Sequence, residues 1–210
     1  MNPSDFIRAN STLIAPPLVP ELRLHLASEV VPLWRKTEEE LHEMGVPPPY
    51  WAFAWVGGQA MARHLLDNPS LVAGKRVLDF GSGSGMVALA AAKAGAAHVL
   101  AADIDKFSIA AIAANAAANG LAVSTTSDDI IGSTEQFGVI LVGDMCYERP
   151  LADRLMAWLK SSNAEILIGD PGRSYFPKDG LTRLALYSVA TTTEIEDREI
   201  RETGVWRLDR

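Results

Sequence analysis

Hydrophobic side chains recur at two different intervals along the chain, and the change falls near residue 48. From Leu18 to Met44 they recur every three or four residues, a spacing typical of amphipathic helices. Pro32 interrupts this stretch and predicts two helices in place of one. We therefore expect residues 1–48 to form a helical extension of the domain that follows.

After residue 48, short apolar runs alternate with amphipathic or alanine-rich stretches. The apolar runs predict five strands, at residues 76–80, 97–105, 122–127, 137–144 and 165–170. The stretches between them predict helices at residues 86–94, 106–120 and 151–160. Two further strands, within residues 186–197 and 203–209, have no helix between them and therefore predict an antiparallel hairpin.

This order of elements predicts the fold class. Strands that alternate with helices form a parallel sheet covered on both faces, because each crossover lays a helix over the sheet. We therefore predict an α/β fold with a doubly wound, mostly parallel seven-stranded sheet that ends in an antiparallel C-terminal hairpin. Residues 1–210 are expected to form a single domain, with residues 49–210 as its core, because no repeat or linker divides the sequence.

Composition and charge exclude several function classes. The formal net charge of -7 disfavours a broad face for binding nucleic acid. Cys146 is the single cysteine, so an internal disulfide is excluded, and no Cys/His cluster has the spacing of a metal site. No apolar run is long enough to span a membrane, and the N-terminus lacks the pattern of a secretory signal. We therefore expect a cytoplasmic protein without metal, membrane or nucleic-acid contacts, and a monomer.

A glycine loop after the first core strand carries candidate cofactor chemistry. Gly81, Gly83 and Gly85 stand between a strand and a helix, where a ligand can approach the backbone and free N–H groups. Asp103 ends the second strand, where a carboxylate can accept both hydroxyls of a ribose. Asp79 precedes the loop, and its charge disfavours a diphosphate but suits an ammonium group. An adenosyl ligand with an amino-acid end therefore fits better than a dinucleotide.

These segments resemble the class I S-adenosylmethionine-dependent methyltransferases. The stretch "VLDFGSGSG" matches the first motif of that family, and Asp103 matches its ribose-binding acid. The resemblance implies a Rossmann-like fold, S-adenosyl-L-methionine as cofactor, and a further acid near the adenine after the third strand. Asp128 and Asp129 compete for that place, and the register with the following apolar pair favours Asp129.

Within this class, the chain is most similar to the seven-strand lysine methyltransferases. The segments that carry this resemblance are "YWAFAWVGGQAMARHLLDNP", "AADID", "LVGDMCYE", "ILIGDPGR" and "GVWRL", although Val56 stands where proline is usual. The resemblance implies protein-lysine N-methylation, with lysines of the electron transfer flavoprotein beta subunit as substrate. Ribosomal protein L11 or a small amine are alternative substrates, and a non-catalytic cofactor-binding interaction module is the alternative to an enzyme.

The remaining candidates belong to the acceptor side of such a site. Asp144 ends the fourth core strand, and ligands of doubly wound sheets lie outside the carboxyl ends of the strands. We predict that Asp144 orients an incoming lysine ammonium and that Tyr147 shapes its channel. Trp55 is predicted to lie against the cofactor, where a ring face attracts a sulfonium, and Trp51 to wall the substrate channel. Cys146, between two acids, is interpreted as unreactive.

The turn "GDPGR" after the fifth core strand is interpreted as structural at Asp170 and Pro171. Arg173, at its end, is a candidate to face an acidic feature of a substrate.

Overall fold

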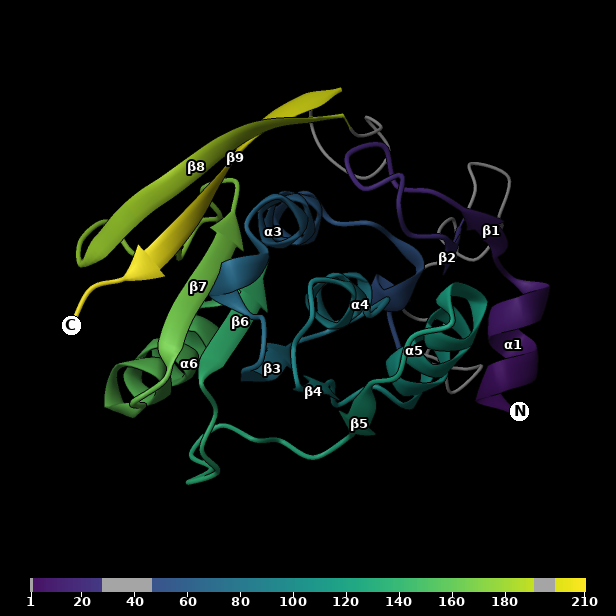
Figure 1. Ribbon diagram of the computed structural model, residues 1–210, viewed down its shortest axis with the longest axis horizontal. Helices are drawn as coiled ribbons and strands as arrows, with labels where there is room; N and C mark the ends of the chain where they lie inside the picture. The colour runs from purple at the N-terminus through teal and green to yellow at the C-terminus, as the bar shows by residue number, and fades with distance from the viewer. Residues whose placement is uncertain (1, 28–46, 191–198) are drawn as a thin grey trace.

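The apolar runs form the central sheet of the computed structural model, which describes residues 2–27, 47–190 and 199–210 (Figure 1). Its strands are β3 (Arg76–Phe80), β4 (His98–Ala102), β5 (Ser124–Thr126), β6 (Val139–Gly143), β7 (Glu165–Asp170), β8 (Leu181–Ala190) and β9 (Ile200–Leu208). They lie in the order β5-β4-β3-β6-β7-β9-β8. Strands β3 to β7 all run parallel to one another, whereas β9 runs antiparallel to its two neighbours, β7 and β8. The prediction of a mostly parallel seven-stranded sheet with a C-terminal hairpin is confirmed.

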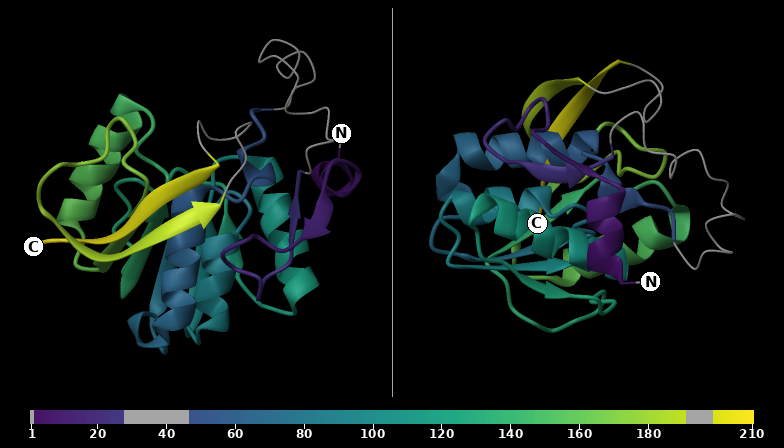
Figure 2. Two further views of the ribbon diagram at one scale, coloured as in Figure 1. Left: turned by 90° about the horizontal axis from the view of Figure 1, so that it is seen from above. Right: turned by 90° about the vertical axis from the view of Figure 1, so that its right-hand side faces the viewer.

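Helices cover both faces of this sheet. Helices α3 (Val56–Asp67), α4 (Met86–Lys93) and α5 (Lys106–Asn119) lie on one face, and α6 (Arg149–Ser161) lies on the other (Figures 1 and 2). Alternate residues of β6 serve the two layers: Val139 and Leu141 pack in the cluster that includes α3 and α4, whereas Ile140 and Val142 pack with α6. Burial on both sides explains why the central strands are continuous apolar runs.

The strand order places a crevice at the carboxyl edge of the sheet. From β3 the chain continues outward through β4 and β5, and from β6 it continues in the opposite direction to β7. Connections from β3 and β6 therefore diverge, which opens the space where doubly wound proteins bind ligands. The glycine loop, Asp103 and Asp144 all follow the strands that end at this edge.

The N-terminal segment differs from the prediction. It contains α1 (Pro3–Ala9) and a small antiparallel sheet of β1 (Thr12–Ile14) and β2 (Leu24–Leu26). The predicted helix is wrong for residues 18–27, because Leu24 and Leu26 are buried on either side of the less buried His25, a two-residue period. The rest of the predicted helical stretch, 28–44, lies outside the described residues, and the boundary at residue 48 stays a prediction.

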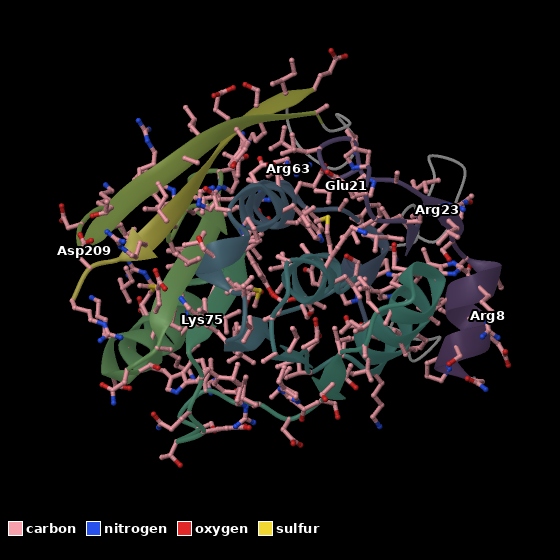
Figure 3. All side chains as sticks on the ribbon, viewed as in Figure 1. Arg8, Glu21, Arg23, Arg63, Lys75 and Asp209 are labelled. Atoms are coloured by element: carbon pink, nitrogen blue, oxygen red, sulfur yellow. The ribbon has the colours of Figure 1, made fainter. Side chains whose placement is uncertain are left out.

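Side-chain contacts hold this segment against the helices of the core. In Figure 3, Glu21 lies beside Arg63 of α3, and their side chains form an ion pair with a nitrogen–oxygen distance of 2.7 Å. The backbone N–H of His25 donates to the side-chain oxygen of Asn115 in α5 at 2.7 Å. Two short 3₁₀ turns, η2 (Tyr50–Ala52) and η3 (Pro69–Leu71), flank α3. The first of these turns brings the chain back to the carboxyl edge of the sheet.

Candidate active site

A cavity of about 720 Å³ opens at the carboxyl edge of the sheet. This volume lies within the range of about 300–1,000 Å³ that is usual for small-molecule sites. Seven predicted site residues line the cavity: Trp55, Gly81, Gly83, Asp103, Asp129, Asp144 and Tyr147. Three others, Trp51, Asp79 and Gly85, do not line it.

The glycine loop is built from left-handed backbone conformations. Gly81, Gly83 and Gly85 have φ angles of 66°, 51° and 80°, which favour glycine. At Gly81 an added Cβ would collide with the side chain of Met145, so the loop and the end of β6 are in direct contact. At Gly85 an added Cβ would lie 3.1 Å from Ile112 of α5, so this glycine serves helix packing rather than ligand contact.

Asp79 lies beneath this loop and is 2% exposed. Its carboxylate accepts hydrogen bonds from the hydroxyl of Ser82 and, at 3.0 Å, from the N–H of Ala88 in α4. Burial raises the pKa of Asp79 to about 7. These hydrogen bonds give Asp79 a role in holding the loop, and its interaction with the ammonium group of a ligand stays a prediction.

Asp103 presents its carboxylate to the cavity from the end of β4. One oxygen accepts from the N–H of Gly83 at 2.8 Å, and the other accepts from the N–H of Asp105 at 2.9 Å. Each carboxylate oxygen has further lone pairs that can accept from ligand hydroxyls. Burial raises the pKa of Asp103. This donor and acceptor set, beside Gly83, where the space next to the backbone is open, fits an adenosyl group.

Asp129 lies on the cavity wall near α6, and Asp128 lines the cavity as well. Asp129 pairs with Arg154 of α6 at 2.8 Å and accepts from the N–H of Ile131 at 3.1 Å. The hydrogen bond from Arg154 lowers the pKa of Asp129. The pairing fixes this acid against α6, and its place next to an adenine stays a prediction.

Aromatic rings form the wall on the side of η2. The ring of Tyr50 lies 6.0 Å from the rings of both Trp55 and Tyr147, measured between centroids. Trp55 also donates from its indole N–H to the backbone oxygen of Tyr50 at 2.9 Å. Trp51 points the other way: it is 0% exposed and packs against Phe6 of α1.

The prediction that Trp51 walls the substrate channel is therefore wrong. The 3₁₀ turn η2 sends neighbouring side chains in different directions, so Trp51 enters the core and Tyr50 reaches the cavity. Tyr50 was missed because the sequence gives no bounds for a three-residue turn of this kind.

Asp144 has a backbone conformation that sets it apart. Its φ is 57°, and no other non-glycine residue in the described part of the chain has a positive φ. Its exposed fraction is 8%. One carboxylate oxygen accepts from the N–H of Gly58, in the first turn of α3, at 3.1 Å. The other accepts from Nε and Nη2 of Arg173 at 3.0 and 2.7 Å. Asp144 therefore joins β6, α3 and the turn after β7.

Arg173 was expected, at most, to meet an acid of the substrate, but it meets an acid of its own chain. Its guanidinium lines the cavity and lies over the ring of Trp55, 5.8 Å from the ring centroid. No spacing in the sequence indicates this pairing, because the two residues lie 29 positions apart and meet only where β6 and β7 are adjacent.

Cys146 and Tyr147, on the β6–α6 connection, stay uncharged near neutral pH. Burial, and then the charges of Asp170 and Asp144, raise the pKa of Cys146 to about 12. This agrees with its interpretation as an unreactive residue. Burial raises the pKa of Tyr147 to about 12 as well, so its hydroxyl can donate a hydrogen bond but is a poor base.

Within residues 2–27, 47–190 and 199–210, no group of three or more His, Cys, Asp or Glu side chains is arranged to hold a metal ion. In the same ranges, no helix combines the length and apolar character needed to cross a membrane.

A doubly wound sheet with a reversed last strand, a glycine loop after β3 and an acid after β4 define a class I, seven-strand methyltransferase. The family model of ribosomal protein L11 methyltransferase (PrmA) matches residues 60–145. The electron transfer flavoprotein beta subunit lysine methyltransferase of Xenopus laevis is 39% identical over 99% of this chain and 87% of that protein. Its human counterpart is 38% identical over 90% of this chain and 75% of that protein. The chain belongs to the family of electron transfer flavoprotein beta subunit lysine methyltransferases.

Solved structures support the fold. A ribosomal protein L11 methylase from Lactobacillus delbrueckii subsp. bulgaricus superposes with a TM-score of 0.54 at 22% identity, covering 75% of this chain and 81% of its own. A magnesium protoporphyrin IX methyltransferase from Synechocystis superposes with a TM-score of 0.54 at 15% identity, covering 72% of this chain and 78% of its own. At these identities the likeness shows the fold alone.

Proposed function

We propose that this chain is an S-adenosylmethionine-dependent protein-lysine N-methyltransferase that acts on the beta subunit of electron transfer flavoprotein. The observation that carries the proposal is the similarity to lysine methyltransferases of that name, which extends over 99% of this chain. This similarity extends over the segments that form the acceptor side of the cavity as well as those that form the cofactor side. We also propose that the protein acts in the cytoplasm and as a monomer.

The cavity offers a consistent place for the cofactor. S-adenosyl-L-methionine, when bound, supplies an activated methyl group on a positively charged sulfur. Asp103 would accept from the ribose hydroxyls, and Gly83 would leave room for the ligand above the loop, because an added Cβ there would have only the backbone oxygen of Tyr50 within 4 Å. Trp55 would offer its ring face to the sulfonium, an attraction of roughly 0.5–2 kcal/mol. Asp129 would lie at the adenine end.

The acceptor lysine would enter beside Asp144. This carboxylate lies on the cavity wall together with Tyr50 and Tyr147, whose rings would line the aliphatic part of the lysine side chain. Asp144 would orient the acceptor nitrogen, and the proton of that nitrogen would leave to water. Tyr147 would act through shape and hydrogen bonding, since its hydroxyl stays protonated.

Ribosomal protein L11 is the less favoured substrate. The Vibrio cholerae ribosomal protein L11 methyltransferase is 50% identical, but over only 30% of this chain and 21% of that protein. The family model likewise stops at residue 145, before Tyr147 and Arg173. The likeness to L11 methyltransferases therefore covers the cofactor side and leaves out most of the acceptor side.

Label transfer separates the candidate functions. The purified protein is incubated with S-adenosylmethionine labelled in the methyl group and with electron transfer flavoprotein, ribosomal protein L11 or free lysine as acceptor. We expect label on lysines of the flavoprotein beta subunit, located by mass spectrometry of its peptides. Label on L11 or free lysine alone would replace the proposed substrate, and cofactor binding without any transfer would favour the interaction module.

A further inference from the structure

An acid at the acceptor site raises a problem of charge. A lysine amine in water has a pKa of about 10.4, and a nearby carboxylate raises that value because it stabilises the ammonium. Methyl transfer requires the neutral amine, whose lone pair is free. A site that held the lysine with Asp144 alone would therefore keep the nitrogen in its unreactive form.

The structure supplies a cation that offsets this acid. Arg173 directs two donors, Nε and Nη2, at one oxygen of Asp144, and the two side chains are only 17% and 9% exposed. The second oxygen faces the N–H of Gly58 at the N-terminus of α3, which carries a partial positive charge. Arginine keeps its charge throughout the accessible pH range. The charge of Asp144 is therefore offset before a substrate arrives.

The turn after β7 holds Arg173 in this place. The backbone N–H groups of Gly172 and Arg173 both donate to one oxygen of Asp170 at 2.7 Å. The guanidinium is then flanked by the ring of Trp55 on one side and by Asp144 on another. Three separate segments of the chain thus fix the position of this charge at the cavity wall.

We propose that Arg173 is a positioning residue, which offsets the charge of Asp144 so that the carboxylate orients the acceptor nitrogen without holding it as an ammonium. The inference rests on the proposed lysine methylation. The step it concerns is the loss of one proton from the acceptor ammonium to water, which leaves the lone pair on nitrogen. The like charge of Arg173 disfavours the ammonium next to it and so promotes that loss.

Other titratable groups face the same place from the surrounding elements. They are Asp170 from the end of β7, Cys146 and Tyr147 from the β6–α6 connection, Tyr50 from η2 and Asp103 from the end of β4. Cys146 and Tyr147 have pKa values raised to about 12 by burial, so they stay neutral between pH 6 and pH 10. Burial, followed by the charge of Asp144, raises the pKa of Asp170 to about 7. Asp170 therefore needs its own control.

The test compares single-turnover methyl transfer to electron transfer flavoprotein between pH 6 and pH 10. In Arg173→Gln we expect a loss of about tenfold or more at pH 7 that largely recovers by pH 10, because one pKa unit of the acceptor amine corresponds to a factor of about ten. Arg173→Lys keeps the charge and should keep a profile close to that of the unchanged protein. A uniform loss at every pH in both variants would overturn the proposal, since a structural defect does not move the profile.

Two control variants complete the profile. Asp170→Asn keeps an oxygen for the N–H of Arg173 and removes the carboxyl that titrates near pH 7, and we expect the alkaline limb of its profile to stay in place. Arg183→Gln removes an arginine that lies over the ring of Trp206, outside the cavity. Its profile should match that of the unchanged protein. A shift in Arg183→Gln as large as that in Arg173→Gln would overturn the assignment to Arg173.

A second measurement needs no cofactor. The affinity for the flavoprotein at pH 7, measured by calorimetry, should be equal or higher in Arg173→Gln than in the unchanged protein. The reason is that Asp144 then pairs with the lysine ammonium without competition from Arg173. Weaker binding would contradict the proposal. If the unchanged protein transfers no label at all, the proposed function fails; if it transfers label and the profile of Arg173→Gln does not move, only this inference fails.

Discussion

Removing the Asp144 carboxylate is expected to destabilise the fold as well as the reaction. In Asp144→Ala, the guanidinium of Arg173 and the N–H of Gly58 both lose their acceptor. The backbone at this position would also keep its positive φ of 57°, which alanine tolerates less well than aspartate or asparagine. This variant therefore removes a structural connection among β6, α3 and the turn after β7.

The expected loss of folding stability follows from the burial of the Asp144–Arg173 pair. Breaking a buried ion pair by removing one partner typically costs about 3–5 kcal/mol. Arg173 keeps 17% of its side chain exposed and can turn partly to water, so we take the lower end, about 3 kcal/mol. The left-handed backbone adds about 1 kcal/mol for alanine. Asp144→Asn keeps one oxygen for Arg173 and tolerates this φ, so its cost should be about 2 kcal/mol.

Urea unfolding measures both costs from the shift of the midpoint at constant slope. Methyl transfer should be lost in both variants, whereas cofactor affinity, measured by calorimetry, should be largely unchanged in the better folded Asp144→Asn. If the alanine variant unfolds within about 1 kcal/mol of the unchanged protein, Asp144 does not join the three elements in solution. If Asp144→Asn turns over normally, the carboxylate does not orient the acceptor.

Three further predictions concern the cofactor side. Asp103→Asn should weaken binding of S-adenosylmethionine by about tenfold or more, because hydrogen bonds to a charged acceptor contribute about 1.5–3 kcal/mol; unchanged affinity in calorimetry would remove Asp103 from the ribose site. Gly81→Ala should lower stability and cofactor affinity through both its φ of 66° and the collision with Met145, whereas Gly74→Ala, with a φ of 69° and open space around it, measures backbone strain alone. Equal losses in the two glycine variants would show that the contact with Met145 does not matter. The raised pKa of Asp79, about 7, means that the folded state keeps a proton which the unfolded chain releases above about pH 4. Its contribution to stability should therefore fall by about 1.4 kcal/mol per pH unit from about pH 4 to pH 7, and Asp79→Asn should remove that fall in urea unfolding; an identical pH dependence in this variant would contradict the assignment.

The sheet could be predicted because its central strands are buried on both faces. Val139 to Val142 face two helical layers in turn, so every position is apolar and the run is visible in the sequence. The topology then placed Gly81, Asp103 and Asp144 at one edge without any side-chain information. The N-terminal segment was misjudged because the leucines at 22, 24 and 26 satisfy a helical and a strand period over so short a stretch.

The pairing of Asp144 with α3 gives the two glycines after Trp55 a structural role. In the structure, an added Cβ at Gly57 would collide with the backbone of Gly169 and lie 2.5 Å from the Asp144 carboxylate. The glycine pair therefore lets the first turn of α3 lie against the ends of β6 and β7, close enough for Gly58 to donate to Asp144.

This packing changes how the acceptor acid is understood. The sequence alone predicts Asp144 as a strand-end acid that orients a lysine ammonium. Asp144 is instead a largely buried carboxylate with donors already on both oxygens, from Gly58 and from Arg173. Such a group can orient a neutral amine through its remaining lone pairs, but it gains less from an additional cation than a free carboxylate would. Under the proposed mechanism, the contacts that restrain Asp144 favour the deprotonated form of lysine, which is the form that accepts a methyl group.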